Sequence, residues 1–138
     1  MTGKEYLKQY KYAADNVERL RAEYDKEVEQ IDSISSPLGG DGMPSGGRIS
    51  KALEDRAIRL AEKATEWKQA ELNALEIRQE IFRTLNQVEG VRGTLLIEKY
   101  LNLKAWREVA DCIGYSASRT YELHNEALEI LADLIKAE

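Results

Sequence analysis

Apolar side chains recur every three or four residues along the first part of the chain, and charged side chains fill the positions between them. From residue 2 to about residue 34 the apolar positions are Tyr10, Ala13, Val17, Leu20, Tyr24, Val28 and Ile31. Steps that alternate between three and four are typical of a helix with a narrow coiled-coil seam. A helix of this length, about 50 Å, is not stable alone, so we expect residues 1–34 to lie against another helix.

A second pattern of the same kind runs over residues 49–88. Its apolar positions are Leu53, Ala57, Leu60, Ala64, Trp67, Ala70, Ala74, Ile77, Ile81, Leu85 and Val88. Ser50 is the expected N-cap, because serine is favoured there. Two helices of similar length with matching seams predict an antiparallel coiled-coil hairpin, but four helices paired in a homodimer fit the pattern equally well.

The segment between the two patterns, residues 35–48, is rich in glycine, serine and proline. Such a composition buries too little apolar surface to offset the entropy of ordering, so a flexible linker is predicted. A glycine-rich loop can cradle a phosphate, but no Gly-Lys-Ser/Thr sequence follows this one. A nucleotide-binding loop is therefore not expected.

Two shorter helical patterns lie within residues 89–138, on either side of a glycine. The apolar faces are Trp106, Val109, Ala110 and Ile113 in the first, and Thr120, Leu123, Ala127 and Leu131 in the second. Gly114 permits a left-handed C-cap, and Ser116 is a favoured N-cap for the next helix. A turn this short makes two helices cross steeply, so the spacing predicts a helix-turn-helix.

The helix that leads into this motif is expected to begin at Val91, after an interruption at Glu89 and Gly90. Its apolar side is Leu95, Leu96, Tyr100 and Leu101, and residues 102–105 form a short link. Ala105 stands where serine or threonine usually caps the helix that follows, and the loss of such a cap costs about 1 kcal/mol.

Composition and charge restrict the functional classes. The formal net charge is −5, which argues against strong nonspecific binding to nucleic acid, although a local basic surface would suffice for DNA. Cys112 is the single cysteine, which excludes an internal disulfide, and its place beside Ile113 favours a buried thiol in a reducing cytoplasm. With no apolar run of about 20 residues and no apolar core in the first residues, we expect no membrane span and no signal peptide.

The sequence offers few residues suited to enzyme catalysis. His124 is the only histidine, so neither a histidine metal triad nor a Ser-His-Asp constellation can form within the chain. The carboxylates sit between apolar positions on helices, which is the arrangement of a solvated face. We therefore expect no enzyme activity, no metal, no cofactor and no small-molecule substrate, and we expect His124 to fill a helix face.

The sequence WREVADCIGYS, followed by SRTYELHNEAL, resembles the helix-turn-helix in the fourth region of bacterial sigma factors. It is more similar still to the version in small phage and prophage proteins of the late-transcription-regulator type, the ArpU- and RinA-like proteins. Those chains commonly begin like MTGKEYLKQY, carry a linker like SPLGGDGMPSGG and end in a sigma-like motif, and all three segments occur here in that order. The resemblance implies an all-α fold, with a long N-terminal helical hairpin or coiled coil and a C-terminal sigma-like helix-turn-helix.

DNA readout is the chemistry that such a motif predicts, because its second helix lies in the major groove. The side chains after the Ser116 cap that avoid the buried face are Ala117, Ser118, Arg119, Tyr121, Glu122 and Asn125. By resemblance to the sigma motif, Ala117, Ser118, Arg119, Tyr121 and Glu122 hold the base- and phosphate-facing positions. Arg119 can bind guanine or a phosphate, and Glu122 can accept a hydrogen bond from cytosine. Ser116 and the first amides of this helix suit a phosphate, while Lys104 and Arg107 are placed to bind the DNA backbone.

Two departures favour the alternative of an ordinary exposed helix face. Ala117, Tyr121 and Glu122 occupy places where basic or amide side chains are common, and Thr120 replaces the usual apolar β-branched residue.

The function implied by the resemblance is a transcription regulator in the cytoplasm of a bacterial host. It would bind double-stranded DNA, while the long helices form a homodimer or dock on RNA polymerase. The rival interpretations are a protein-interaction module that never meets DNA and a phage packaging factor similar to a small terminase subunit.

Overall fold

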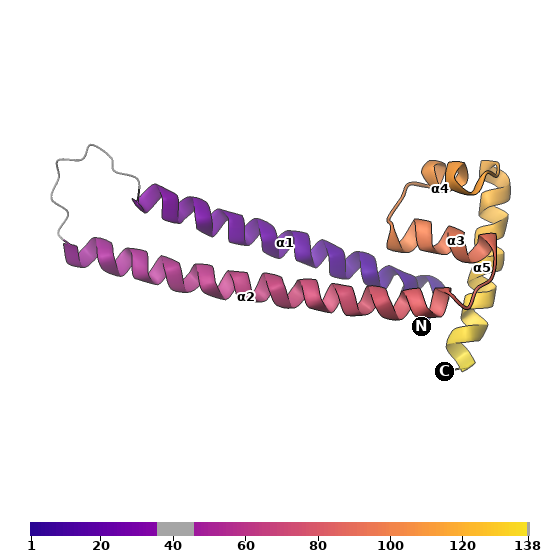
Figure 1. The fold of residues 1–138 in the computed structure, drawn as a ribbon, viewed down its shortest axis with the longest axis horizontal. Helices are drawn as coiled ribbons and strands as arrows, with labels where there is room; N and C mark the ends of the chain where they lie inside the picture. Colours follow the sequence, from indigo (N-terminus) through magenta and orange to yellow (C-terminus); the bar gives the residue numbers. More distant parts are fainter. Residues whose placement is uncertain (36–45, 138) are drawn as a thin grey trace. The chain divides into compact units, whose positions relative to one another are not determined.

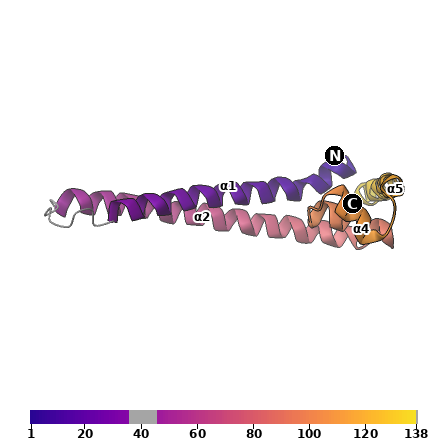
Figure 2. The ribbon, with the colours of Figure 1, turned by 90° about the horizontal axis from the view of Figure 1, so that it is seen from above.

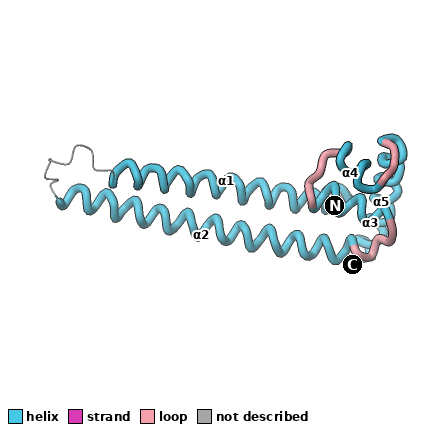
Figure 3. Tube along the Cα trace, turned by 45° about the horizontal axis from the view of Figure 1, so that its top comes forward, coloured by secondary structure: helices cyan, strands magenta, loops and turns pink. Residues whose placement is uncertain are grey.

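The computed structural model describes residues 1–35 and 46–137, and every regular element among them is helical (Figures 1 and 3). The elements are α1 (Gly3–Ser35), α2 (Gly46–Leu85), α3 (Val91–Leu96), the π-helix η1 (Ile97–Leu101), α4 (Trp106–Ile113) and α5 (Ala117–Ala137). The predicted all-α fold with a long N-terminal helical hairpin is confirmed. The chain divides into two compact units, which we call the hairpin unit (Asp15–Leu72) and the core unit (Met1–Ala14 with Asn73–Glu138).

The hairpin unit pairs the second part of α1 with the first part of α2. The Tyr24 ring packs on the Trp67 ring with centroids 5.3 Å apart, and Lys63 forms an ion pair with Glu23 at 3.3 Å. Glu27 follows Glu23 along α1, but its ion-pair partner Arg56 precedes Lys63 along α2. The two helices are therefore antiparallel. Most of the predicted seam positions are half-buried here, whereas Ala57 is exposed and Ala70 is buried.

Helix boundaries differ from the sequence interpretation by a few residues. Helix α2 begins at Gly46, so Ser50 lies inside the helix and the prediction that it is the N-cap was wrong. The same helix ends at Leu85, three residues before the predicted end. The predicted flexible linker over 35–48 falls mainly on residues 36–45, which lie outside the described residues.

The hydrophobic core of the core unit draws on every helix of that unit. A buried hydrogen bond of 2.9 Å joins the Tyr6 and Thr84 hydroxyls and ties the start of α1 to the end of α2. The fully or nearly fully buried apolar side chains of this core are Tyr6, Leu7, Ile81, Leu85, Leu95, Leu96, Tyr100, Leu101, Val109, Leu123, Ala127 and Leu131. The apolar positions predicted at residues 95, 96, 100, 101, 109, 123, 127 and 131 are therefore core positions.

The turn from α2 into α3 is a close approach of two backbone segments. Gly90 has a φ of 75°, in the region that favours glycine, and α3 begins at the next residue as predicted. Gly93 is buried against the backbone of Leu85 and Val88. After α3 the helix widens into η1, where the Asn102 N–H donates to the Ile97 carbonyl at 2.9 Å.

None of the described helices combines the length and the apolar character that a bilayer span requires.

Candidate nucleic-acid interface

Helices α4 and α5 are joined by a turn with the backbone that the sequence predicted. Gly114 adopts the left-handed conformation (φ 76°, ψ 29°), and its N–H donates to the Ala110 carbonyl at 2.9 Å. The Ser116 Oγ accepts from the Arg119 N–H at 3.2 Å, which confirms Ser116 as the N-cap of α5. With only three residues between them, α4 runs across α5 rather than alongside it (Figure 1), and Figure 2 views α5 nearly along its axis.

The buried face of this helix pair fixes which side chains remain outside. Val109, Leu123 and Ala127 are fully or almost fully buried, as their spacing predicted. Thr120 is also buried, at 1% exposure, and its hydroxyl donates to the Ser116 carbonyl at 2.7 Å. That hydrogen bond satisfies the hydroxyl, which explains how threonine occupies a core position.

The residues predicted to contact DNA occupy the opposite face of α5 and its N-terminal end. Those with exposed side chains are Ser116, Ala117, Ser118, Arg119, Tyr121, Glu122 and Asn125, together with Arg107 on α4. Lys104 precedes α4 and is partly buried. The structure brings Arg107, Ser116, Ala117 and Tyr121 together around a groove of about 480 Å³ between the two helices.

The aromatic wall of this groove was not foreseen from the sequence. The Tyr121 ring stacks on the Trp106 ring, with centroids 5.0 Å apart and an interplanar angle of 29°. Tyr121 is nevertheless 52% exposed, so one face of its ring remains available to a ligand. The stacking restricts the side chain and lowers the entropy that a contact from it would cost.

Two of the predicted DNA-contacting cations are paired with carboxylates in the free protein. Arg119 Nη1 lies 2.9 Å from Glu122 Oε2, and this hydrogen bond raises the pKa of Arg119. Lys104 Nζ lies 2.5 Å from Glu98 Oε2, which raises the pKa of Lys104 and lowers that of Glu98. To bind DNA, Arg119 and Lys104 would each have to leave the carboxylate partner and contact a phosphate or a base instead.

The environment of the chain's cysteine differs from the prediction. Cys112 was expected to be buried beside Ile113, but it is exposed, and the Lys104 ammonium donates to its Sγ at 3.3 Å. The inward face of α4 is formed by Val109 and Ala110. Cys112 lies two residues beyond Ala110, a turn of about 200° around the helix axis, so it points away from that face.

His124 lies on the buried face of α5, at 5% exposure. Its Nε2 is hydrogen-bonded to the Tyr100 hydroxyl at 2.8 Å, and its ring meets the Trp106 ring edge-on at 4.6 Å. Burial, together with the charges of Lys4 and Lys99, lowers the pKa of His124 to about 4. His124 is therefore neutral at pH 7, and burial likewise raises the pKa of Tyr100 to about 12, so that both partners are uncharged.

No family model, curated protein or solved structure matches the chain.

The chemistry of this surface is therefore the basis on which a function can be proposed. An exposed helix begins at a serine cap, carries one guanidinium and one carboxylate a turn apart, and borders an aromatic groove. Hydrogen-bond donors and acceptors of this kind suit base edges and phosphates, and the groove suits an apolar side chain.

Proposed function

We propose that the chain is a sequence-specific DNA-binding transcription regulator of phage or prophage origin, of the sigma-like helix-turn-helix type that its sequence resembles. The observation that carries the proposal is the solvent-exposed face of α5 from Ala117 to Asn125, on a helix whose other face is buried against α4. A recognition helix needs this division, because one face must be fixed by the core while the other enters the major groove.

In the proposed complex, the N-terminal half of α5 lies against base edges. Arg119 leaves Glu122 and binds a guanine, while Glu122 accepts a hydrogen bond from a cytosine amino group. Ser116 and the first backbone amides of α5 face a phosphate, and Arg107 holds the backbone beside α4. Ala117 contacts a thymine methyl.

A homodimer would offset a recognition surface with few cations. The formal charge of −5 opposes DNA on average, so two linked copies would gain affinity from simultaneous engagement. The seam of the hairpin unit supports this step, because most of its apolar side chains are only half-buried and leave surface for a second copy. RNA polymerase is the second partner that the resemblance suggests.

Selection from a randomised 20-base-pair duplex library tests DNA readout directly. The parent is expected to enrich a preferred sequence, and Arg119→Ala is expected to bind it roughly tenfold more weakly in fluorescence anisotropy and to lose discrimination at one position. Arg59→Ala removes the same charge from an exposed position of the hairpin unit and is the matched control. If no sequence is enriched, or both variants bind like the parent, the regulator proposal fails.

The ion pair of Arg119 with Glu122 leads to a second prediction, in which a substitution strengthens DNA binding instead of weakening it. Glu122→Gln is expected to raise the affinity for unselected duplex DNA several-fold, because it frees Arg119 and removes a negative charge that faces phosphates. The anisotropy titration, repeated between about 50 and 200 mM salt, should give a steeper salt dependence for the variant. Glu129→Gln, farther along α5 and also exposed, is the control that should change affinity less.

The groove of Trp106 and Tyr121 favours one alternative, a protein-interaction module. A groove of about 480 Å³ with a stacked aromatic wall suits an apolar side chain of a partner protein. Under this alternative Arg119→Ala has no DNA phenotype, whereas Tyr121→Ala abolishes partner binding. The packaging-factor alternative requires a ring of many subunits, which light scattering distinguishes from a dimer.

A further inference from the structure

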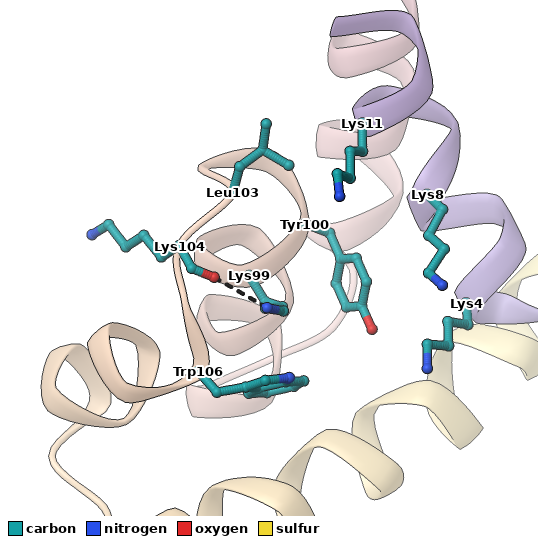
Figure 4. A pocket seen from close by; sticks show the side chains of 8 residues that line it. All are labelled: Lys4, Lys8, Lys11, Lys99, Tyr100, Leu103, Lys104 and Trp106. Atoms are coloured by element: carbon teal, nitrogen blue, oxygen red, sulfur yellow. Dashed lines mark hydrogen bonds between the residues drawn. The ribbon is translucent and has the colours of Figure 1, made fainter. Parts of the chain in front are cut away.

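Four lysine side chains gather around a second pocket of the core unit, which shares Trp106 with the groove. The pocket has a volume of about 300 Å³. Its lining residues are Lys4, Lys8 and Lys11 of α1, Lys99 and Tyr100 of η1, and Leu103, Lys104 and Trp106 (Figure 4). Among the described residues, none that lines the pocket is acidic.

The arrangement follows from helical spacing on α1 and from the fold of the core unit. Lys4, Lys8 and Lys11 are four and three residues apart, so they share one face of α1. Figure 4 shows their side chains and that of Lys99 around the Tyr100 ring. Lys104 differs, because its ammonium points away from the pocket while its carbonyl accepts a hydrogen bond from Lys99 Nζ at 3.2 Å.

The four ammonium groups gathered around this pocket have no ion-pair partner in the part of the chain that the structure describes. Within residues 1–35 and 46–137, no carboxylate forms an ion pair with Lys4, Lys8, Lys11 or Lys99. Burial and the charges of Lys11 and Lys4 lower the pKa of Lys99. Uncompensated ammonium groups are costly to hold together, and an anion in their midst would relieve the repulsion.

We propose that this lysine pocket is a binding site for a phosphate group. Lys4, Lys8 and Lys11 supply ammonium donors from one side and Lys99 from the other, with the Tyr100 hydroxyl between them. The hydroxyl can accept from His124 Nε2–H and donate its own hydrogen to a phosphate oxygen. The volume accommodates a phosphate or pyrophosphate group, and the rest of a larger ligand would extend past the Trp106 ring.

Two sources of phosphate share this chemistry, a free phosphate compound and the backbone of a DNA duplex. The site does not depend on base reading by α5, so it would stand even if the chain recognised no DNA sequence. If the phosphate belongs to a DNA backbone, the site would add phosphate contacts beyond Lys104 and Arg107 and would partly offset the net negative charge of the chain.

Trp106 supplies a direct reporter of occupancy. Lys99 Nζ lies 4.7 Å from the centre of its ring, so an anion that draws this ammonium away should change the fluorescence of Trp106. The chain has two tryptophans, and Trp67→Phe in the hairpin unit leaves Trp106 as the only one. Sodium pyrophosphate is titrated against this variant at constant ionic strength, and isothermal calorimetry gives an independent affinity.

The expected result is saturable pyrophosphate binding that Lys8→Gln with Lys99→Gln weakens at least about tenfold, because two charge-assisted contacts are lost. The matched control is Lys68→Gln with Lys136→Gln, which removes two exposed lysines outside the pocket and should change the affinity less than twofold. Circular dichroism confirms that each variant keeps its helix content. The conservative pair Lys8→Arg with Lys99→Arg should retain binding, because it keeps the charge.

An unselected 30-base-pair duplex then distinguishes the two sources. If the duplex competes with pyrophosphate and the Lys8/Lys99 glutamine pair lowers its salt slope by about one to two, the site seats a backbone phosphate. If pyrophosphate binds and the duplex does not compete, the ligand is a free phosphate compound. The proposal is overturned if neither probe binds saturably, or if the control pair weakens binding as much as the pocket pair. Arg119→Ala should leave pyrophosphate affinity unchanged, which separates failure of this site from failure of the proposed DNA readout.

Discussion

Gly93→Ala is expected to destabilise the core unit by roughly 3 kcal/mol or more, a large part of the stability of a small domain. A Cβ atom built on Gly93 would lie 2.0 Å from the Val88 carbonyl oxygen and 3.3 Å from that of Leu85. Both atoms belong to the backbone, so no side chain can rotate to relieve the overlap. The turn between α2 and α3 would have to open, and the core that both helices share would open with it.

Urea denaturation followed by circular dichroism measures this loss. Gly3→Ala is the matched control, because its new Cβ would meet its nearest atoms, in Leu128 and Leu131, at about 3.4 Å, which is ordinary contact. Alanine also favours a helix over glycine, so Gly3→Ala should be neutral or slightly stabilising. Equal midpoints for Gly93→Ala and the parent would show that the close approach at Val88 is not required.

Acidification from pH 6.5 to pH 4 is expected to destabilise the core unit by up to about 3 kcal/mol through His124. The pKa of His124 falls from 6.5 in the unfolded chain to about 4 in the folded one, chiefly because the ring is buried. Between these two values the unfolded state binds the proton and the folded state does not. The contribution of His124 to stability is therefore complete above pH 6.5 and is lost as the pH falls toward 4.

Unfolding midpoints measured at several pH values test this slope. His124→Gln cannot titrate, so its stability should depend less on pH over the same window, although it is expected to be lower at pH 7 because the contacts with Tyr100 and Trp106 change. The resonance of the histidine ring in the parent should titrate well below pH 6. A His124 that titrates near 6.5 in the folded protein would contradict the prediction.

Local patterns in the sequence predicted the elements that local chemistry controls. The seams of α1 and α2, the left-handed Gly114 and the Ser116 cap each depend on residues within one or two turns of the chain. The buried face of α5 follows from helical spacing alone. The sequence also contains the spacing of a π-helix, because the buried pairs Leu95 with Tyr100 and Leu96 with Leu101 are five residues apart.

Features that depend on distant segments could not be predicted in this way. Gly93 is only a glycine inside a short helix until the backbone of Val88 is placed against it. The spacing of Lys4, Lys8 and Lys11 is compatible with one helix face, but nothing in the sequence brings Lys99 to them. The hydrogen bond of Tyr100 with His124 spans 24 residues and likewise needs the tertiary fold.

The outward position of Cys112 gives the protein a built-in attachment point. It is the chain's single thiol, so a maleimide dye or a nitroxide would couple at one known place without any change to the sequence. The label would sit on α4, next to Lys104 and within a turn of the helix-turn-helix corner. A probe placed there would sense any macromolecule that approaches this corner, whatever its chemical nature.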